Sequence, residues 1–309
     1  MAKEYDVVII GGGPAGMSAA IYCTRANMSC CIIDKSMLGG RPLGYLEIEN
    51  YLGLGKTSTI DMIEKFSEHV ASFDIPVFEG EEIEEIDLEN KIIKTNEHTF
   101  KSKAIIIATG SKPRLLNVDG EKEVTGRGVH YCAICDGHFY KDKVVAVIGG
   151  GNSACEEALF LSNIAKEVYI IQDLSSLTAD KVTVEMIDKK ENIKVFYNAQ
   201  VKAIRGEDKV NCICLETHGD IQCCQYLNVD GVFPFIGFTA NSEMFEVEKN
   251  RGFIITNEHM LTSMEGVFAV GDVRVKDYRQ VVTAVADGAI GGIEASSYIR
   301  NLVKVEIIS

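Results

Sequence analysis

A run of consecutive apolar residues, then three glycines, then a helical pattern occurs twice along the chain. The first copy is YDVVIIGGGPAGMSAAIYC from Tyr5, and the second is KVVAVIGGGNSACEEALFL from Lys143. A short β-branched run predicts a buried parallel strand, and the glycines allow a tight turn into the helix. The chain therefore contains an internal repeat of a strand, a turn and a helix.

The first copy has the spacing of a dinucleotide-binding turn. Gly11, Gly13 and Gly16 satisfy G-x-G-x-x-G, in which the glycines let the backbone approach a pyrophosphate at the helix N-terminus. The next apolar run, CCIID, ends in Asp34, where a carboxylate can accept the ribose hydroxyls. This pattern predicts a nucleotide site at the first turn.

The second copy repeats the arrangement with one substitution. Gly149, Gly151 and Ala154 fill the same places, and the run VYIIQD follows. Two more apolar runs, AIIIATG at 104–110 and GVFAVGD at 266–272, each predict a buried strand that ends in a turn of small residues. Two copies in the same context predict an α/β dinucleotide-binding fold.

Composition narrows the class of protein. A chain of 309 residues with 46% hydrophobic content can form two domains of ordinary size. Its net charge of -14 repels phosphate backbones, so we expect no nucleic-acid partner. The apolar run Val7 to Ile10 is too short for a signal peptide, and no run of 18 apolar residues follows. We therefore expect a cytoplasmic protein with no membrane partner.

The segment HYCAICDGHFY places Cys132 and Cys135 two residues apart, directly before Asp136. This spacing suits half of a zinc site, a structural crosslink or a dithiol that is oxidised and reduced in turnover. Most other cysteines are expected to be reduced thiols, and SCCIID predicts a buried strand. Four more cysteines could in principle bind zinc: Cys212, Cys214, Cys223 and Cys224. Their spacing is not the paired C-x2-C spacing of zinc ribbons, and NCICLE predicts an alternating strand, so we expect no metal.

The order of these motifs resembles the low-molecular-weight thioredoxin reductases over nearly the whole chain. The matching stretches are GGGPAG, IENYLG, AIIIATGS, CAICDG, GGGNSACEEALFLSNIAKEV, GVFAVGDV and YRQVVTA. The resemblance implies two Rossmann-like, three-layer ββα nucleotide-binding domains, the second inserted into the first. Residues 1–114 and 243–309 would form the FAD-binding domain, and 115–242 an inserted NAD(P)H-binding-like domain with the CxxC.

The resemblance also implies which residues hold FAD. Arg41 follows two glycines where the family usually has glutamine, so that contact is not transferred. The expected cofactor-binding residues are Gly11, Gly13, Pro14, Ala15, Gly16, Asp34, Asn50, Thr109, Gly110, Gly271, Asp272, Arg279, Gln280 and Val281.

In such enzymes reduced flavin passes two electrons to the CxxC disulfide, and the dithiol then reduces a partner disulfide. By resemblance Cys135 faces the flavin, Cys132 attacks thioredoxin, and the protein is a homodimer. A neighbouring ionised carboxylate raises the pKa of a thiol, so Asp136 is better explained as a proton donor and acceptor. His130 and His138 could relay protons, but the simpler interpretation is that both are surface or half-buried histidines.

The electron donor is less clearly indicated. The family's NADPH signature, HRRDxFRA, is replaced by QDLSSLTA at 172–179, which contains no arginine to bind a 2'-phosphate. The chain in this respect resembles the ferredoxin-dependent flavin thioredoxin reductases, and we favour ferredoxin as donor. NADH, selected by Asp173, and NADPH are the alternatives.

A ferredoxin is acidic, as this chain is, so a local basic surface would be required. It could come from residues 101–127, or these could be an ordinary solvated face. The alternative from another class of function is a flavin electron carrier or a redox sensor. A reductase turns over a thioredoxin disulfide many times, whereas a sensor stops after one. The basic residues of 101–127 are Lys101, Lys103, Lys112, Arg114, Lys122 and Arg127.

Overall fold

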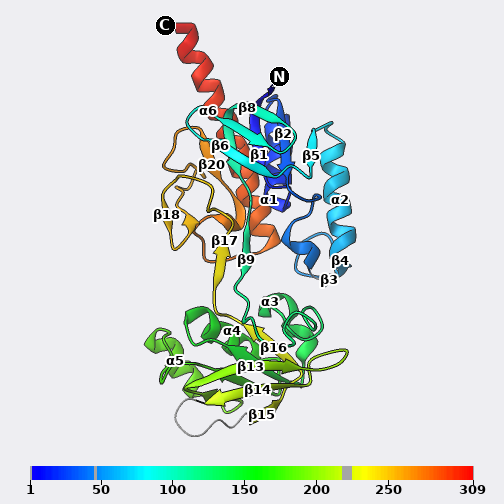
Figure 1. Ribbon diagram of the computed structural model, residues 1–309, viewed down its shortest axis with the longest axis vertical. Coiled ribbons are helices and arrows are strands. Elements are labelled where there is room, and N and C mark those ends of the chain that lie inside the picture. The colour runs from blue at the N-terminus through cyan, green and yellow to red at the C-terminus, as the bar shows by residue number, and fades with distance from the viewer. Residues whose placement is uncertain (1, 45–46, 218–224, 309) are drawn as a thin grey trace. The chain divides into compact units, whose positions relative to one another are not determined.

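The computed structural model describes residues 2–44, 47–217 and 225–308 and divides into two compact units (Figure 1). Unit 1 comprises Met1–Lys112 and Thr239–Ser309, and unit 2 comprises Pro113–Phe238. The chain therefore leaves unit 1 after Lys112 and returns at Thr239. The domain boundaries expected from the sequence lie a few residues further along, after 114 and after 242.

Unit 1 is built on a seven-stranded sheet in the order β5-β2-β1-β8-β7-β6, with β20 also paired to β8. Neighbouring strands among β1, β2, β5, β8 and β20 are parallel, whereas β7 and β6 are antiparallel. The strands are β1 (Lys3–Ile10), β2 (Cys30–Asp34), β5 (Val77–Glu79), β6 (Ile83–Asp87), β7 (Ile92–Thr95), β8 (Thr99–Ile107) and β20 (Val267–Ala269).

The apolar run of β1 is continuous because both faces of the sheet are covered. Val7 and Ile9 pack into one hydrophobic cluster, and Val8 and Ile10 into another. Successive side chains of a strand point to opposite faces, so a strand buried on both sides has no polar alternation. The buried strands predicted at β1, β2, β8 and β20 are confirmed.

Helices α1 (Pro14–Arg25), α2 (Thr59–Ala71) and α6 (Val281–Ile308) belong to unit 1. Small residues bring α6 close to α1: a Cβ added to Gly288 would lie 2.1 Å from the carbonyl oxygen of Ala15. No larger residue at Gly288 can keep this packing, because the neighbouring atom is backbone. The long helix is thereby held against the helix that follows the first glycine turn.

The remaining elements of unit 1 are short. Strands pair as β3 with β4 and as β18 with β19, while β9 pairs with β17 where the chain passes between the units. Their bounds are η1 (Arg41–Gly44), β3 (Glu47–Ile48), β4 (Thr57–Ser58), β9 (Ser111–Pro113), β17 (Phe238–Ala240), β18 (Lys249–Asn250), β19 (Phe253–Ile254) and η3 (Gly271–Val273).

Unit 2 has a four-stranded parallel sheet in the order β12-β11-β10-β16 and a three-stranded antiparallel sheet in the order β13-β14-β15 (Figure 1). Its helices are α3 (Ala133–Asp136), η2 (Gly137–Tyr140), α4 (Asn152–Ser162) and α5 (Lys181–Asp188). Its strands are β10 (Val144–Ile148), β11 (Glu167–Ile171), β12 (Ile193–Phe196), β13 (Ala199–Arg205), β14 (Cys212–Thr217), β15 (Gln225–Asn228) and β16 (Gly231–Pro234).

The parallel sheet of unit 2 lies between two cores. Ala146 and Ile148 of β10 pack with residues of the antiparallel sheet, whereas Val145 and Val147 pack with α4. This arrangement gives a three-layer ββα unit. The predicted α/β fold with two Rossmann-like units is therefore confirmed. Within the residues described, no helix is long and apolar enough to span a membrane.

Candidate active site

The first glycine turn joins β1 to α1, and its three glycines serve different purposes. Gly11 has φ +110°, and a Cβ added there would lie 2.5 Å from the carbonyl oxygen of Ala108. A Cβ on Gly16 would lie 1.9 Å from the Gly11 oxygen. At Gly13 the nearest atom would be 4.0 Å away, so the protein itself has space for a side chain there. Only Gly13 leaves room that a ligand could use.

Asp34, at the end of β2, stabilises this turn through hydrogen bonds to its backbone. One carboxylate oxygen accepts a hydrogen bond from the Gly12 amide at 2.6 Å, and the other accepts from the Ser36 amide at 2.8 Å. The side chain thus has a structural task within unit 1. Its predicted contact with ribose hydroxyls stays a prediction.

The second glycine turn, between β10 and α4, is packed against neighbouring segments in the same way as the first. A Cβ on Gly149, at φ +123°, would lie 2.6 Å from the carbonyl oxygen of Phe235, and one on Gly150 would lie 2.5 Å from the Gln172 amide group. The Thr178 amide donates to the Gly150 oxygen at 2.7 Å. The segment after β11 therefore folds back onto the turn.

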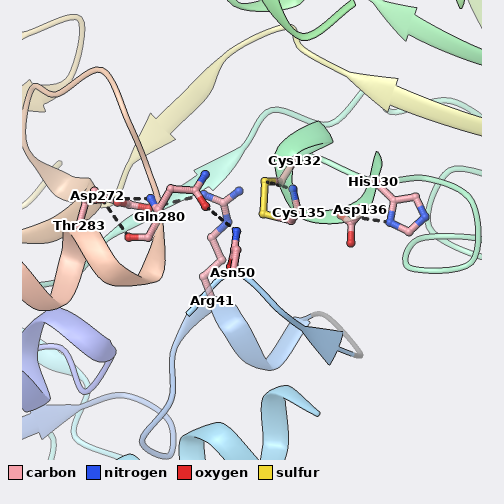
Figure 2. The surroundings of a disulfide bond; sticks show 9 residues. All are labelled: Arg41, Asn50, His130, Cys132, Cys135, Asp136, Asp272, Gln280 and Thr283. Carbon is pink, nitrogen blue, oxygen red and sulfur yellow. Dashed lines mark hydrogen bonds and ion pairs between the residues drawn. A yellow bond between two sulfur atoms is a disulfide. The ribbon is translucent and has the colours of Figure 1, made fainter. Parts of the chain in front are cut away.

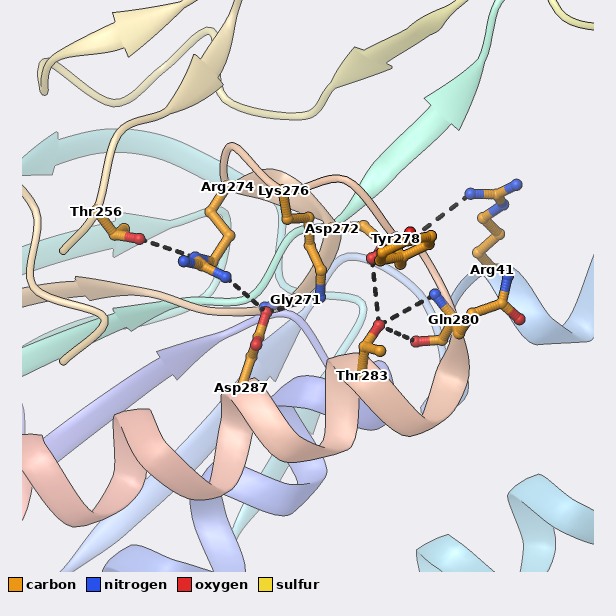
Figure 3. Close-up of polar contacts among 10 residues, drawn as sticks. All are labelled: Arg41, Thr256, Gly271, Asp272, Arg274, Lys276, Tyr278, Gln280, Thr283 and Asp287. Atoms are coloured by element: carbon orange, nitrogen blue, oxygen red, sulfur yellow. Dashed lines mark hydrogen bonds and ion pairs between the residues drawn. The ribbon is translucent and has the colours of Figure 1, made fainter. Parts of the chain in front are cut away.

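Asp272 follows β20 at the carboxyl edge of the sheet in unit 1, and its side chain is 16% exposed (Figure 3). Burial raises the pKa of Asp272, and the Arg41 guanidinium, 3.6 Å from Oδ2, opposes this. Its Oδ1 atom is buried and has no hydrogen-bond partner among the described residues. A buried acceptor without a donor costs about 1–3 kcal/mol, so this atom suits a ligand hydroxyl.

The loop that carries Asp272 is held by Asp287 of α6 (Figure 3). The Asp287 carboxylate accepts from the Gly271 amide at 3.2 Å, from Arg274 at 3.3 Å and from Lys276 at 2.8 Å. Sequence reasoning did not select Asp287. The available signal was an acidic residue within the otherwise apolar stretch VVTAVADGAIGG, which is typical of a buried, paired charge.

Two other predicted residues meet although they are far apart in sequence. The Asn50 side-chain amide donates to Gln280 Oε1 at 3.2 Å (Figure 2). The Arg279 guanidinium lies over the Phe253 ring at 4.3 Å, and burial lowers the pKa of Arg279. Val281 begins α6. These predicted residues therefore gather around the start of α6.

Four more predicted residues belong to unit 1. Pro14 begins α1, and Ala15 is buried in its first turn. The Thr109 hydroxyl donates to the Asn241 carbonyl oxygen at 2.6 Å, and the Asn241 amide donates to the Gly110 oxygen at 3.0 Å. Thr109 and Gly110 are thus occupied in joining two segments of unit 1.

In unit 2, Cys132 and Cys135 form a disulfide at the start of the short helix α3 (Figure 2). Cys132 is the N-cap residue, and its sulfur accepts the Cys135 amide at 3.2 Å. Both cysteines are partly exposed. Asp136, the last residue of α3, is only 5% exposed. The thiol pair can therefore meet a partner while the adjacent carboxyl group is shielded from water.

The expectation that His130 is a surface or half-buried histidine is wrong. Its side chain is buried, and its Nδ1 lies 3.3 Å from Asp136 Oδ2 (Figure 2). The backbone of His130 pairs with Val232 of β16, which places the ring inside the unit. No sequence signal indicated this burial. His138 is exposed, as expected.

The other described cysteines do not form a ligand cluster. Cys23, Cys30, Cys31 and Cys155 are buried, and burial raises the pKa of each thiol. The expected strand at NCICLE is β14, although its centre is buried on both faces rather than alternating. Cys223 and Cys224 lie outside the described residues.

One group of side chains has the proximity of metal ligands among the described residues: Glu81, Glu97 and His98. Glu81 Oε1 contacts His98 Nδ1 at 2.5 Å, and Glu81 also accepts the Thr95 hydroxyl. These bonds satisfy the buried carboxylate without an ion. The group therefore serves as an internal polar contact.

The two Rossmann-like units and the partly exposed disulfide define a flavin-dependent disulfide oxidoreductase. The chain belongs to the pyridine nucleotide-disulphide oxidoreductase family, which it matches over residues 5–288. Within that family it falls among the low-molecular-weight thioredoxin reductases.

Three known proteins illustrate the relationship. A thioredoxin reductase of Bacillus subtilis is 38% identical, with 97% of this chain and 96% of that protein covered. The structure of thioredoxin reductase from Streptococcus pyogenes is 38% identical, covers 97% of this chain and 100% of its own, and has a TM-score of 0.87. A ferredoxin-flavin thioredoxin reductase from Clostridium acetobutylicum is more distant, at 27% identity and a TM-score of 0.52, with 98% and 100% covered.

Proposed function

We propose that this protein reduces the disulfide of thioredoxin through the Cys132–Cys135 pair, with FAD as its cofactor. The observation that carries the proposal is the partly exposed disulfide with a buried carboxyl group immediately after it. The names of the relatives support thioredoxin as the substrate. A structural crosslink would not need a carboxylate held out of water beside it.

The two sulfurs take different roles in this proposal. Cys135 accepts electrons, and Cys132 attacks the substrate disulfide as a thiolate to form a mixed disulfide, which Cys135 then resolves. Asp136 exchanges a proton with the sulfur that leaves. Its place supports this role because the buried carboxyl group belongs to the same short helix as Cys135 and directly follows it in the chain.

The residues of unit 1 fit FAD in two ways. The open space at Gly13 suits a pyrophosphate close to the first turn of α1, and the unpartnered Oδ1 of Asp272 suits a hydroxyl of the ribityl chain. When bound, the flavin supplies two-electron transfer to the disulfide. Asn50 and Gln280, which contact each other, would orient the ring.

For the electron donor we propose reduced ferredoxin rather than NADPH. Residues 172–180 contain no lysine or arginine, and Asp173 is exposed directly after the buried Gln172 at the end of β11. A 2'-phosphate there would meet a negative charge and no fixed cation. Losing two or three charged hydrogen bonds of about 1.5–3 kcal/mol each weakens NADPH by at least about a hundredfold.

NADH is the alternative donor, because Gly151 leaves space at the second turn: the nearest atom to an added Cβ is Thr178 Oγ1 at 3.8 Å. Of the basic residues proposed for ferredoxin binding, Lys101, Lys103 and Lys112 belong to unit 1, and Arg114, Lys122 and Arg127 belong to unit 2. Of these, Lys103 is already paired with Asp6 at 2.8 Å. We also propose a homodimer, as the family resemblance implies, which light scattering of the purified protein can test.

The test is anaerobic stopped-flow bleaching of the flavin by equal concentrations of reduced ferredoxin, NADH and NADPH at low salt. Fast bleaching by ferredoxin alone is expected. Fast bleaching by NADPH refutes the protein donor. Fast bleaching by NADH that disappears in Asp173→Ala establishes the alternative.

The cysteines are tested separately. Cys132→Ser and Cys135→Ser should each lose thioredoxin reduction while retaining flavin, and Cys132→Ser should show a long-wavelength absorbance band from the remaining thiolate. Cys155→Ser, at a buried cysteine of the same unit, is the control and should keep its activity. Normal turnover in both CxxC variants would make the pair structural.

A further inference from the structure

A chain of three buried polar side chains lies behind the disulfide in unit 2. His130 Nδ1 is 3.3 Å from Asp136 Oδ2, and His130 Nε2 is 2.8 Å from the Tyr140 hydroxyl. His130 is 8% exposed, and Asp136 and Tyr140 are each 5% exposed. Figure 2 shows Asp136 between the disulfide and His130. The roles proposed for the two cysteines do not use His130 or Tyr140.

The hydrogen bond to Tyr140 is compatible with a proton on the nitrogen of His130 that faces Asp136. Burial raises the pKa of Tyr140, so its hydroxyl stays protonated and can donate to Nε2. In the neutral imidazole the proton then resides on Nδ1, which faces Asp136. Asp136 Oδ2 has no hydrogen-bond partner in the described parts of the chain, because the two atoms are close but not aligned. A small movement of either side chain would complete the bond.

The packing around His130 keeps its ring in this place. The ring stacks on Phe233 of β16 with centroids 5.7 Å apart, and it meets the Tyr140 ring edge-on at 5.5 Å. A Cβ on Gly231 would lie 2.3 Å from the Tyr140 ring, so the β16 backbone lies directly against that tyrosine. The glycine is therefore required for the position of Tyr140.

Two further charged groups, Lys143 and Asp230, act on the Tyr140 end of the cluster. Lys143 Nζ is 5.3 Å from the centre of the Tyr140 ring, and Asp230 acts on Tyr140 electrostatically while binding the Val144 amide. Among the described residues, Asp136 is the carboxylate in ion-pair contact with His130. The His130 imidazole thus contacts the carboxyl group of Asp136, which directly follows Cys135 in the chain.

We propose that His130 is a positioning residue that returns to Asp136 the proton which Asp136 exchanges with the CxxC dithiol. This inference rests on the proposed disulfide reduction and adds to it a second proton carrier, with Tyr140 holding its tautomer. His130 suits the task because an imidazole can both carry and release a proton near neutral pH.

The proton balance follows from the bond changes. Two electrons from the reduced flavin break the Cys132–Cys135 bond and leave two sulfur anions, one of which takes a proton from the Asp136 carboxyl group. The imidazolium of His130 then reprotonates Asp136 through Nδ1 and becomes neutral. When the dithiol reduces a substrate disulfide, Cys132 attacks as the thiolate, and Asp136 gives its proton to the first substrate sulfur that leaves. Asp136 then takes the thiol proton of Cys135, which resolves the mixed disulfide, and passes that proton to the second substrate sulfur. Between turnovers His130 takes up two protons from solvent in succession, transfers the first to Asp136 and keeps the second.

The test uses enzyme reduced anaerobically with dithionite and mixed with oxidised thioredoxin, so that it does not depend on the natural donor. Flavin reoxidation is followed from pH 5.5 to 8.5. His130→Gln keeps a polar side chain of similar reach that cannot titrate. We expect its rate at pH 7 to fall about tenfold and its pH profile to differ in shape from that of the wild type, because glutamine cannot exchange a proton. His138→Gln, at the exposed histidine of the same segment, should behave as wild type.

A double variant separates positioning from an independent role. Adding His130→Gln to Asp136→Asn should cause no further loss, since the proton would have no acceptor. If the rate losses of the two single variants multiply in the double variant, or if His130→Gln keeps the wild-type pH profile, the inference is overturned while disulfide reduction stays intact.

If the wild-type enzyme does not reduce thioredoxin, the proposed function fails separately. The His130 comparison is then made with 5,5'-dithiobis(2-nitrobenzoic acid), whose product absorbance reports the same dithiol chemistry. A fall of about tenfold in His130→Gln with this reagent supports the inference. An unchanged rate and pH profile overturns it.

Discussion

Glu157 on α4 should make unit 2 less stable as the pH rises. Burial, with a smaller contribution from Glu156, raises the pKa of Glu157 from its ordinary 4.5 to about 7. Its Oε2 atom is buried and lacks a hydrogen-bond partner in the described portion of the chain. The folded state therefore favours the neutral acid, and Glu157→Gln replaces it with a neutral side chain of the same shape.

The sign and size of the effect follow from linkage. Between pH 4.5 and 7 the folded chain binds more protons at Glu157 than the unfolded chain, so the free energy of unfolding falls as the pH rises. A shift of about 2.5 pH units at about 1.4 kcal/mol each sets an upper limit of ~3.5 kcal/mol. Glu157 is partly exposed, so solvent screening reduces this value. We expect Glu157→Gln to stabilise the protein by about 1–3 kcal/mol at pH 8 and hardly at all at pH 4.5.

Urea unfolding of wild type and Glu157→Gln, followed by circular dichroism at several pH values between 4.5 and 8, measures this difference. Other titrating groups contribute equally to both proteins and cancel. Glu185→Gln on α5 is the matched control, because Glu185 is exposed. If the wild-type and Glu157→Gln curves stay parallel across this range, Glu157 titrates as an ordinary carboxylate and the reasoning from its burial is wrong.

Two further predictions concern unit 1. Gly13→Val should give a folded apoprotein, whereas Gly16→Val should not fold, because only a Cβ at Gly16 would meet backbone, 1.9 Å from the Gly11 oxygen. Circular dichroism and flavin absorbance distinguish the two outcomes. A yellow Gly13→Val protein would contradict the first prediction. Asp287→Ala leaves the Lys276 side chain, which is 9% exposed, without its partner and should cost about 3–5 kcal/mol in urea unfolding. A wild-type unfolding curve would show that the pair is not needed to hold the loop.

Local features of the sequence were sufficient to predict the frame of this protein. The apolar runs of β1 and β10 and their glycine turns could be recognised because strand periodicity and backbone sterics act within a few residues. The same holds for the C-x-x-C spacing, since two residues in one helical turn bring both sulfurs together. Domain roles and FAD contacts came from the resemblance of whole motifs and stay predictions.

Contacts between distant segments could not be obtained in this way. Asn50 and Gln280 are 230 positions apart, and only the folded sheet brings them together. Asp272 looked like a simple ligand residue, whereas the structure shows a carboxylate whose pKa is raised by burial and balanced by Arg41.

The sequence by itself determined the two repeated turns and the closely spaced cysteine pair, because these depend on local geometry and on residue type. The tertiary structure decided which polar groups lose contact with water. His130 was expected at or near the surface, but the pairing of its backbone with β16 buries it beside Asp136. Burial and electrostatic environment are sums over neighbours from many segments, so a histidine in a short motif acquires its chemical role only when the chain has folded.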